Sequence, residues 1–587
     1  MSFDPRAHLT ALLRSALESV APDHGATPIA LEKPKQASHG DFATNLAMLL
    51  AKSLRLAPRE VAARLVGELP AAHWLAKIEV AGAGFINFTL TGAAKTRIVG
   101  DILAAGPAYG RSSVGAGRSI QVEFVSANPT GPLHVGHGRG AAYGASLAAL
   151  LDFAGFRVSR EYYVNDAGRQ MDILALSTWL RYLELHGEPV PFPPNAYLGD
   201  YVRSMAAQIR DAHGDRYVHP AEAVLACVPA APPAERGDDE AKRLREEHLD
   251  ALITAARDLL GEDWNYIHHY ALTEQLADCR SDMEDFGVHF EQWFSERSLF
   301  DTGLVARAVA QLEKAGQLYV QDGAKWFRST EFGDEKDRVV QRENGLYTYF
   351  ASDIAYHLNK YERGFDRIID VWGADHHGYI ARVKGAVAAL GLDPARLEVA
   401  LVQFAVLYRG GQKTSMSTRS GEFVTLRELR REVGNDAARF FYVLRKSDQH
   451  LDFDLDLARS QSSDNPVYYI QYAHARICSV LAQWGGNVRD LHERAWTPLV
   501  NERELALCAL LREFPQVIET AAAECAPHQI AFYLKDLAAE FHAYYNAERL
   551  LVDDPALKAA RLALAAAVRQ VLQNGLQLLG VSSPEQM

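Results

Sequence analysis

Residues 126–137 combine side chains that suit phosphate chemistry, in the order Ser126-Ala-Asn-Pro-Thr-Gly-Pro-Leu-His-Val-Gly-His137. His134 and His137 flank Gly136, so two imidazoles can donate hydrogen bonds to phosphate oxygens while the glycine leaves room for a nucleotide. An apolar stretch before the segment predicts a buried strand, and the Ala/Leu-rich run 138–153 predicts a helix. A helix N-terminus attracts anions. The segment therefore predicts a site that uses ATP; the alternative is a loop whose histidines only cap the helix.

A second polar segment, Gly410-Gly-Gln-Lys-Thr-Ser-Met-Ser-Thr-Arg-Ser-Gly421, follows the apolar run 399–408. Its small residues and terminal glycines are typical of a loop that closes over phosphates. Lys413 and Arg419 are its two cations, so either one can neutralise a pyrophosphate leaving group. The alternative that neither side chain contacts ATP stays open.

A third cluster, Asp375, His376 and His377, follows the predicted strand 367–371. These residue types also occur in metal sites. Adjacent histidines diverge on a turn, however, and no third ligand is spaced to join them, which argues against zinc. The five cysteines are scattered without a Cys-x-x-Cys pair, which argues against zinc or redox chemistry there too. We therefore expect no zinc and no metal ligands in the chain.

The segment 126–137 resembles the first signature of class I aminoacyl-tRNA synthetases, and its Ala-Asn-Pro-Thr-Gly-Pro lead-in resembles bacterial arginyl-tRNA synthetases in particular. The resemblance covers nearly the whole chain, apart from a stretch around 221–247 rich in alanine, proline and charge. It implies activation of L-arginine with ATP to arginyl-adenylate and pyrophosphate, followed by transfer of arginine to the 3′ end of its tRNA. It also implies that tRNA must be present before activation. Mg²⁺ would accompany the phosphates of ATP.

The loop 410–421 resembles the second class I signature, through Met416 and Ser417 among others, but Ser415 and Thr418 stand where that signature has its two lysines. The departure supports one rival interpretation, a catalytically impaired tRNA-binding paralogue, against which the intact first motif argues. Rivals among the enzymes are a class I synthetase for another amino acid and a small nucleotidyltransferase that shares the first motif.

The resemblance also carries site residues over to this chain. As catalytic groups it implies His134, His137, Lys413 and Arg419. As ATP-binding residues it implies Gly136, His134, His137, Asp375, His376, His377, Met416 and Ser417.

The substrate implied by the resemblance carries a guanidinium, which carboxylates bind best in a fork geometry. Tyr349 and Asp353 are four residues apart and can face one pocket from a helix. The resemblance implies five arginine-binding positions: Glu123, Ser126, Asn128, Tyr349 and Asp353. A salt bridge at a strand end is the alternative role for Glu123, and core packing is the alternative for Tyr349.

The expected fold class is α/β, because strands alternate with helices over residues 111–464 and predict a doubly wound, Rossmann-like catalytic domain with an insertion around 180–300. Residues 1–110 predict a small N-terminal α+β domain, and residues 465–587 predict a helical bundle without strands. The resemblance implies that the first contacts the tRNA elbow and the last binds the anticodon.

Within the predicted bundle, Tyr469, Tyr472 and Arg476 are the expected tRNA contacts, since aromatic rings stack on unpaired bases. Aromatic residues at helical spacing pack in a core more often, so that alternative stays open. The net charge of -13 argues against a general polyanion binder but is compatible with one basic track for a specific RNA.

The composition is that of a globular protein, with 48% hydrophobic and 23% charged residues in 587. No apolar run reaches the roughly 18 residues needed to span a bilayer, and the N-terminus lacks the layout of a signal peptide. We expect a cytoplasmic monomer whose partners are arginine, ATP and the tRNA for arginine, with no membrane contact.

Overall fold

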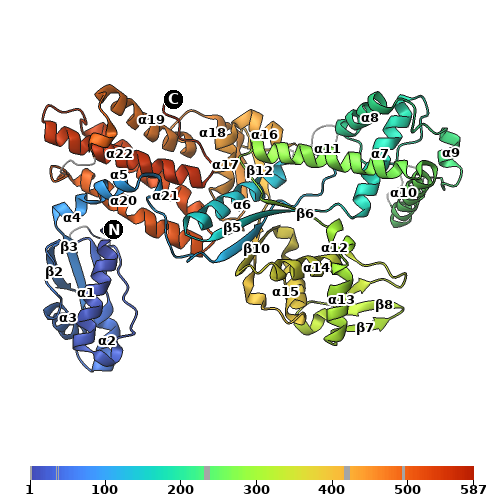
Figure 1. Ribbon diagram of the computed structural model, residues 1–587. Helices are drawn as coiled ribbons and strands as arrows, with labels where there is room; N and C mark the ends of the chain where they lie inside the picture. Colours follow the sequence, from blue (N-terminus) through green and yellow to red (C-terminus); the bar gives the residue numbers. More distant parts are fainter. Residues whose placement is uncertain (1–2, 35, 37–38, 231–237, 415–423, 492–495) are drawn as a thin grey trace.

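The computed structural model describes residues 3–587 except 35, 37–38, 231–237, 415–423 and 492–495. A parallel sheet lies at the centre of an elongated molecule, with a helical bundle on one side and a helical insertion on the other (Figure 1). A small N-terminal unit lies below the bundle in the view of Figure 1. The predicted α/β class, with an N-terminal unit and a C-terminal bundle, is confirmed.

The central sheet has the strand order β11-β10-β4-β5-β6, and every neighbouring pair is parallel. Its strands are β4 (Ser119–Glu123), β5 (Arg157–Val164), β6 (Gln292–Ser295), β10 (Arg367–Gly373) and β11 (Leu397–Val402). From β4 the chain adds β5 and β6 on one side of the sheet. It then returns to β10 on the other side of β4 and adds β11 beyond it. The topological switch point therefore lies between β4 and β10, and ligands of such sheets bind at the carboxyl ends of these strands.

The two faces of the sheet are covered by different helices. Ile369 and Val371 of β10 belong to the core that includes α6 (Val135–Phe153). The alternate residue Asp370 instead contacts α14 (Tyr349–Glu362). Because side chains of a strand alternate between faces, one face of β10 is apolar and the other brings a carboxylate to the site.

Helix α6 packs closely on the sheet at Gly144. A methyl group built there would lie 2.3 Å from Cγ of Phe124, which follows β4. We expect Gly144→Ala to lower the free energy of unfolding by about 1–3 kcal/mol, because the core is overpacked. Gly140 of the same helix has nothing within 4 Å of such a methyl, so Gly140→Ala is the matched control and should stabilise by about 0.5–1 kcal/mol. Chemical denaturation measures both; equal effects would contradict the packing argument.

The helical insertion after β5 has its own hydrophobic core, which includes the buried Trp179. Its helices are α7 (Arg169–Leu185), α8 (Asp200–His213), α9 (Ala221–Leu225), α10 (Asp239–Leu260) and α11 (Asp263–Asp285). Before α14 the chain adds α12 (Arg297–Asp301), α13 (Leu304–Lys314) and the sheet of β7 (Leu318–Gln321), β8 (Ala324–Phe327) and β9 (Arg338–Gln341). After β10 come a short 3-10 turn, Ala374–Tyr379, and α15 (Ile380–Ala389).

A second small sheet, of order β13-β12-β14, follows β11 and leads to the bundle. It comprises β12 (Ala405–Arg409), β13 (Gln412–Lys413) and β14 (Leu451–Asp454), with α16 (Leu426–Val433), α17 (Asn435–Val443) and α18 (Leu455–Arg459) around it. The bundle itself comprises α19 (Pro466–Trp484), α20 (Glu502–Ala523), α21 (His528–Ala547) and α22 (Pro555–Leu578). Asn465 caps α19 through its side chain, and Pro466 is the first helical residue.

The N-terminal unit is an antiparallel sheet, β1-β3-β2, with helices packed on it. It comprises α1 (Pro5–Val20), β1 (Phe42–Thr44), α2 (Leu46–Leu54), α3 (Pro58–Gly67), β2 (Leu75–Ala81), β3 (Phe85–Leu90) and α4 (Gly92–Thr96). Its core ends at Ala94, whereas Ile98 of α5 (Ile98–Ala105) already belongs to the core shared with the bundle. By packing, α5 is thus part of the main body.

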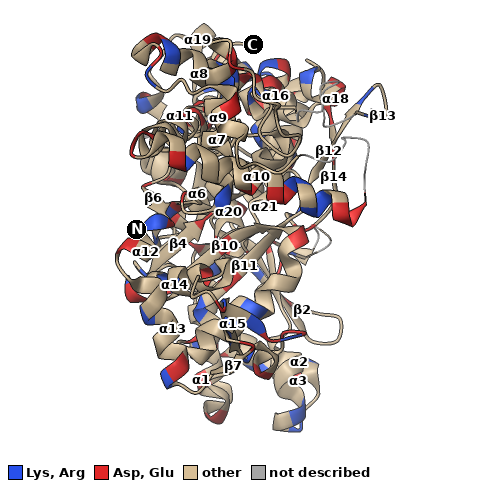
Figure 2. Cartoon of the chain, turned by 90° about the vertical axis from the view of Figure 1, so that its right-hand side faces the viewer, with Lys and Arg blue, Asp and Glu red and all other residues tan. Residues whose placement is uncertain are grey.

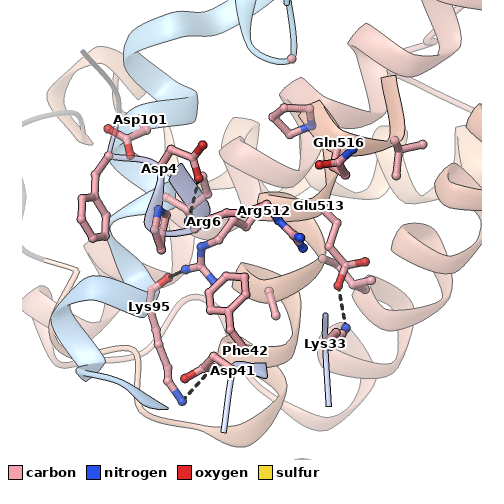
Figure 3. Close-up of a pocket in the computed structure, with 18 of the residues that line it drawn as sticks. Asp4, Arg6, Lys33, Asp41, Phe42, Lys95, Asp101, Arg512, Glu513 and Gln516 are labelled. Carbon is pink, nitrogen blue, oxygen red and sulfur yellow. Dashed lines mark hydrogen bonds and ion pairs between the residues drawn. The ribbon is translucent and has the colours of Figure 1, made fainter. Parts of the chain in front are cut away.

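A cavity with a volume of about 1240 Å³ lies between the N-terminal unit and the bundle, away from the central sheet (Figure 3). Arg512 of α20 crosses it and donates a hydrogen bond to the carbonyl oxygen of Lys95 at 2.6 Å. Lys33 forms an ion pair with Glu513 at 2.7 Å. These contacts link the N-terminal unit to the bundle.

Acidic and basic residues alternate along the chain on the side of the molecule that carries the insertion (Figure 2). Within the described residues, no helix is both long enough and apolar enough to span a membrane.

Candidate active site

The first motif lies at the switch point, between β4 and α6. His134 is the N-cap of α6, and its Nδ1 accepts a hydrogen bond from the backbone N–H of Gly136 at 3.1 Å. The backbone N–H of His134 donates in turn to Nδ1 of His137 at 3.2 Å. The two rings stack, with centroids 3.7 Å apart. Histidines three apart thus form a capping box in which both imidazoles point toward the N-terminus of the helix.

Both histidines of this capping box are neutral at physiological pH. Burial lowers the pKa of His134, and burial together with His134 lowers the pKa of His137 to about 3. Because Nδ1 accepts a hydrogen bond in each ring, the remaining proton is on Nε2. Each ring is therefore a donor through Nε2, the role that phosphate oxygens require.

Gly136 is needed for this arrangement. A methyl group at position 136 would lie 2.8 Å from the His134 ring, so a side chain there would displace the imidazole. The sequence predicts that Gly136 leaves room for a nucleotide. In the structure, the lack of a side chain at Gly136 makes room first for the imidazole of His134.

The segment between β4 and the motif has a strained backbone. Val125 and Ser126 have φ angles of 68° and 40°, which non-glycine residues rarely adopt. The Ser126 hydroxyl donates to Oε1 of Glu123 at 2.8 Å and accepts from the backbone N–H of Tyr163 at 3.0 Å. Asn128 is exposed on the same segment. The strain turns the chain sharply after β4, so that Glu123 and Ser126 meet.

Glu123 is buried and forms an ion pair with Lys360 of α14, whose side chain is 0% exposed. Lys360 also donates to Oδ1 of Asp370 at 2.6 Å, and His357 lies 2.9 Å from the other oxygen of Asp370. Burial opposes ionisation of Asp370, but Lys360 and His357 outweigh it and hold its pKa below the ordinary value. The structure thus places Glu123 in a salt bridge at the end of its strand, the alternative considered from sequence.

Asp353 lies one helical turn after Tyr349 at the start of α14. The Tyr379 hydroxyl donates to Oδ2 of Asp353, and burial raises the pKa of that carboxyl. Tyr349 is 56% exposed, which excludes the core-packing alternative for its ring. Its hydroxyl lies close to Gly168, where a methyl would be 3.1 Å away. Tyr349 therefore lies at the rim of the site, with Asp353 deeper inside.

Glu296, which the sequence analysis missed, is buried beside Asp353. Its Oε1 accepts a hydrogen bond from Ser352 at 2.8 Å. Oε2 of Glu296 and the hydroxyl of Tyr163 are both buried without a hydrogen-bond partner among the described residues. Burial, with the charges of Glu296, Asp353 and Glu123, raises the pKa of Tyr163. Three carboxylates therefore converge on one tyrosine. An acidic residue directly after the short strand β6 was the available signal.

We call Glu123, Glu296, Asp353 and Asp370 the carboxylate cluster. Lys360 pairs with Glu123 and Asp370, whereas Asp353 and Glu296 have no ion pair with any described residue. Burial also raises the pKa of Glu296. The cluster thus has more negative than positive charge and suits a cationic ligand.

The third predicted cluster lies on the 3-10 turn after β10, at the carboxyl end of the sheet. Asp375, His376 and His377 are all exposed, and Nε2 of His376 is 3.6 Å from Oδ2 of Asp375. No group of three or more His, Cys, Asp or Glu side chains arranged to hold a metal occurs among the described residues. The turn that carries Asp375, His376 and His377 lies next to the first motif, because β10 and β4 are neighbouring strands.

The second predicted loop is described only at its ends. Met416, Ser417 and Arg419 lie outside the described residues. Lys413 is exposed in β13, paired with Tyr408 of β12. On the other side, the carbonyl oxygen of Val424 accepts from the N–H of Val135 at 3.0 Å. The loop therefore returns directly beside the first motif.

Arg139 of α6 links the helix that follows the first motif to the segments on either side of the second loop. Its buried guanidinium donates to the carbonyl oxygens of Gln403 at 2.8 Å, Gln449 at 2.7 Å and Lys446 at 3.0 Å. Burial lowers the pKa of Arg139 to about 10, so the side chain stays charged. It connects α6 to Gln403 before the second loop and to Lys446 and Gln449 after it. Sequence reasoning had not singled it out.

In the bundle, the predicted tRNA contacts form one cluster on α19. Arg476 donates to the Tyr472 hydroxyl at 3.1 Å and stacks over that ring, 4.6 Å from its centroid. Tyr472 is exposed. Tyr469 instead packs on His542, with centroids 4.4 Å apart. Tyr472 thus faces outward, Arg476 is half-buried between Tyr472 and Tyr545, and Tyr469 contributes more to packing.

Three family models match the chain. The arginyl tRNA synthetase N terminal domain matches residues 7–90, the catalytic domain of tRNA synthetases class I (R) matches 98–184 and 243–451, and the DALR anticodon binding domain matches 470–587. The matched catalytic region contains the first motif and the carboxylate cluster.

Curated relatives align with the chain from end to end. The arginine–tRNA ligases of Azoarcus sp. (strain BH72) and Aromatoleum aromaticum are 73% and 72% identical over 590 and 588 residues, covering 100% of this chain and of each relative. The solved structure of Thermus thermophilus arginyl-tRNA synthetase has a TM-score of 0.72 at 24% identity, covering 100% of both chains, which shows a shared fold. With family models over most of its length and relatives of this identity over all of it, the chain belongs to the arginyl-tRNA synthetases, the class I ligases that join arginine to its tRNA.

Proposed function

We propose that the enzyme activates L-arginine at the carboxyl edge of the parallel sheet, with the carboxylate cluster receiving the guanidinium and His134 and His137 donating to the phosphates of ATP. The observation that carries the proposal is the excess of buried negative charge at Asp353 and Glu296, beside two neutral imidazoles at a helix N-terminus. A guanidinium supplies the missing positive charge and five N–H donors.

In this proposal, Asp353 and Glu296 bind the guanidinium, and Tyr349 closes the rim over it. Glu123 acts on arginine mainly through its hydrogen bond with Ser126 and its ion pair with Lys360, which hold the strained turn in place. Ser126 and the exposed Asn128 then lie where the amino and carboxyl groups of arginine are expected.

The chemical step is an in-line attack of the arginine carboxylate on the α-phosphorus of ATP, which forms the mixed anhydride and expels pyrophosphate. It needs positioning and charge stabilisation rather than a protein nucleophile. The Nε2–H groups of His134 and His137 would donate to the phosphate oxygens as charge builds up on them. Mg²⁺ would enter with ATP, held mainly by phosphate oxygens. Gly136, Asp375, His376 and His377 remain the proposed contacts with the nucleotide.

The leaving pyrophosphate needs cations. Lys413, Arg419, Met416 and Ser417 remain the proposed residues of the second loop. The hydrogen bonds of Val424 with the first motif and of Arg139 with Gln403 hold the segments that flank this loop beside the first motif, which supports the proposed role of its residues at the phosphates.

The terminal ribose hydroxyl of the tRNA then attacks the arginyl carbonyl and releases AMP. The exposed Tyr472 and the half-buried Arg476 of the bundle are the proposed anticodon contacts, with Tyr469 as their support. We also propose that the enzyme acts as a cytoplasmic monomer and binds no zinc.

The decisive experiment is arginine-dependent exchange of labelled pyrophosphate into ATP, with and without the tRNA for arginine. We expect exchange with arginine and tRNA together and none with the other amino acids. Exchange with a different amino acid would overturn the assignment of the pocket, and no exchange under any condition would favour a tRNA-binding protein without catalysis.

A specific prediction concerns Glu296. Replacing it with glutamine keeps the size of the side chain and the acceptor for Ser352 but removes a buried charge. We expect the KM for arginine to rise by about 10-fold or more, because a guanidinium loses a charged partner, while the KM for ATP stays the same. Glu291→Gln is a control, since Glu291 is exposed and pairs with Arg160. A normal KM for arginine would remove Glu296 from the pocket.

The pH dependence of arginine binding follows from the same carboxyls. Burial raises the pKa values of Asp353 and Glu296 above 3.8 and 4.5, and protonation removes the charge that binds arginine. We expect the KM for arginine to rise as pH falls from about 7.5 toward 5, while His137, whose pKa is lowered to about 3, stays neutral. Steady-state kinetics across this range, repeated with Glu296→Gln, should show a weaker dependence in the variant. A KM independent of pH would contradict the assignment.

A further inference from the structure

Lys360 is a buried cation that the chemical step of the proposed function does not use. Asp370 of β10 and Glu123 of β4 are register partners in adjacent strands, so their carboxylates lie on the same face of the sheet. Lys360 of α14 packs on that face with its side chain 0% exposed. Its Nζ donates to Oε2 of Glu123 and, at 2.6 Å, to Oδ1 of Asp370. One ammonium thus compensates two buried carboxylates that would otherwise repel each other.

Through Glu123, Lys360 is connected to the turn that carries Ser126. Oε1 of Glu123 accepts the Ser126 hydroxyl at 2.8 Å, and Ser126 also accepts from the backbone N–H of Tyr163 at 3.0 Å. The φ angle of Ser126 is 40°, and such a conformation persists only where the contacts around it fix it. Lys360 orients the carboxylate that holds this turn, and the turn is where the amino and carboxyl groups of arginine are proposed to bind.

Through Asp370, Lys360 is connected to the guanidinium end of the proposed site. Nε2 of His357 lies 2.9 Å from Oδ2 of Asp370, and Nδ1 lies 2.7 Å from the carbonyl oxygen of Asp353, one helical turn earlier. Both oxygens are acceptors, so both ring nitrogens donate and the ring is positively charged. Burial raises the pKa of Asp353, whereas the charges of His357 and Lys360 lower it. The charge of Glu123 also raises that pKa, and Lys360 compensates this charge. The network therefore helps to keep Asp353 ionised.

We propose that Lys360 is a positioning residue for arginine: without touching the substrate, it holds the two segments that bind the two ends of the amino acid. The turn after β4 is held through Glu123, and the first turn of α14 is held through Asp370. Of the carboxylate cluster, Asp353 and Glu296 are then the members without an ion pair among the described residues, which fixes where the guanidinium binds. The proposal rests on the proposed function, which assigns this pocket to arginine.

The test is Lys360→Met, which keeps the length of the side chain but removes its charge. We expect the KM for arginine to rise by about 10- to 100-fold, because small displacements of binding groups have effects of this size. The KM for ATP should be unchanged, because His134 and His137 are held by the capping box of α6. Both constants are measured by pyrophosphate exchange with tRNA present.

Lys360→Arg tests whether the positive charge is what holds the site. A guanidinium can donate to two carboxylates at once, so this variant keeps the charge and can keep both contacts. We expect its KM for arginine to lie at least about 5-fold below that of Lys360→Met. Equal KM values in the two variants would overturn the proposal, because a cation at position 360 would then have no effect on arginine binding.

Arg363→Met is the matched control on the same helix. Arg363 donates to both oxygens of the buried Glu161, at 2.5 and 3.0 Å, and Tyr356 donates to the same carboxylate at 2.6 Å. The substitution also leaves a buried carboxylate without its cation, with a comparable loss of stability, but it breaks none of the described contacts of the carboxylate cluster. We expect a wild-type KM for arginine. A rise equal to that in Lys360→Met would overturn the proposal, because a loss of stability would then explain both.

A double variant keeps the test decisive if Lys360→Met does not fold. Lys360→Met with Asp370→Asn leaves one buried carboxylate without its Lys360 partner instead of two. We expect it to fold, as measured by circular dichroism, and to keep a raised KM for arginine, since Glu123 still lacks its partner. A wild-type KM in the double variant would overturn the proposal, because Lys360 would then only compensate the charge of Asp370. So would a wild-type KM in Lys360→Met itself. Failure of the wild-type enzyme to exchange pyrophosphate with arginine would instead reject the proposed function.

Discussion

Replacing His137 with asparagine is expected to slow arginyl-adenylate formation by about 100- to 1,000-fold while leaving tRNA affinity unchanged. The amide oxygen of asparagine lies near the position of Nδ1 and can still accept the backbone N–H of His134, so the N-terminus of α6 keeps its cap. The variant loses Nε2–H, the donor proposed to act on the phosphates. The measurement is the rate of pyrophosphate exchange at saturating arginine, ATP and tRNA.

Glutamine at position 137 is the complementary variant. Its longer side chain places an amide N–H near Nε2 but gives up the acceptor at Nδ1. We expect His137→Gln to be at least about 10-fold faster than the asparagine variant, with a loss of stability of about 0.5–2 kcal/mol from the weakened cap. If the two variants are equally slow, or if asparagine has no effect, His137 does not act through Nε2.

Replacing Asp353 with asparagine is expected to lower kcat/KM for arginine by about 100-fold or more. The asparagine oxygen still accepts the Tyr379 hydroxyl, so the loss is that of the charge opposite the guanidinium. Steady-state arginylation with varied arginine measures the effect, which should appear mainly in the KM for arginine. Citrulline, a neutral arginine analogue, provides a second measurement: in pyrophosphate exchange, the preference for arginine over citrulline should shrink in the variant.

Two further variants separate the charge of Asp353 from its position. Tyr379→Phe keeps the charge but removes the hydroxyl that holds the carboxylate, and it should cost less than Asp353→Asn. Asp393→Asn is a control, because Asp393 only caps the turn before β11 at the other end of the strand. An unchanged preference for arginine over citrulline in Asp353→Asn would reject this carboxylate as the guanidinium partner.

Local sequence accounts for the first motif. The strand, the loop and the helix of residues 119–153 follow one another in the chain, and the strand and helix were both expected from the pattern of apolar residues. His134 and His137 meet because residues three positions apart at the start of a helix can form a capping box. Tyr349 and Asp353 lie on one helix as expected, for the same reason of spacing.

Long-range packing decides the state of the carboxylates. Glu123, an arginine-binding position in the sequence analysis, pairs with Lys360, a residue 237 positions away that sequence reasoning did not weigh. Glu296 was missed because it lies beside Ser352 and Asp353 only after α12 and α14 have packed together. Likewise, the three carbonyl oxygens that accept hydrogen bonds from Arg139 belong to residues 264 to 310 positions further along the chain.

The sequence by itself thus determined the fold class through short-range periodicity, and the ligase family through the resemblance of its motifs. It also determined the local geometry of the first motif, which depends on helix capping. Only the tertiary structure decided which carboxylates are paired with the buried Lys360 and which have no ion pair among the described residues. Charge pairing depends on the order of strands β10, β4, β5 and β6 in the sheet and on the helix packed against them, and no local pattern of residues encodes that order.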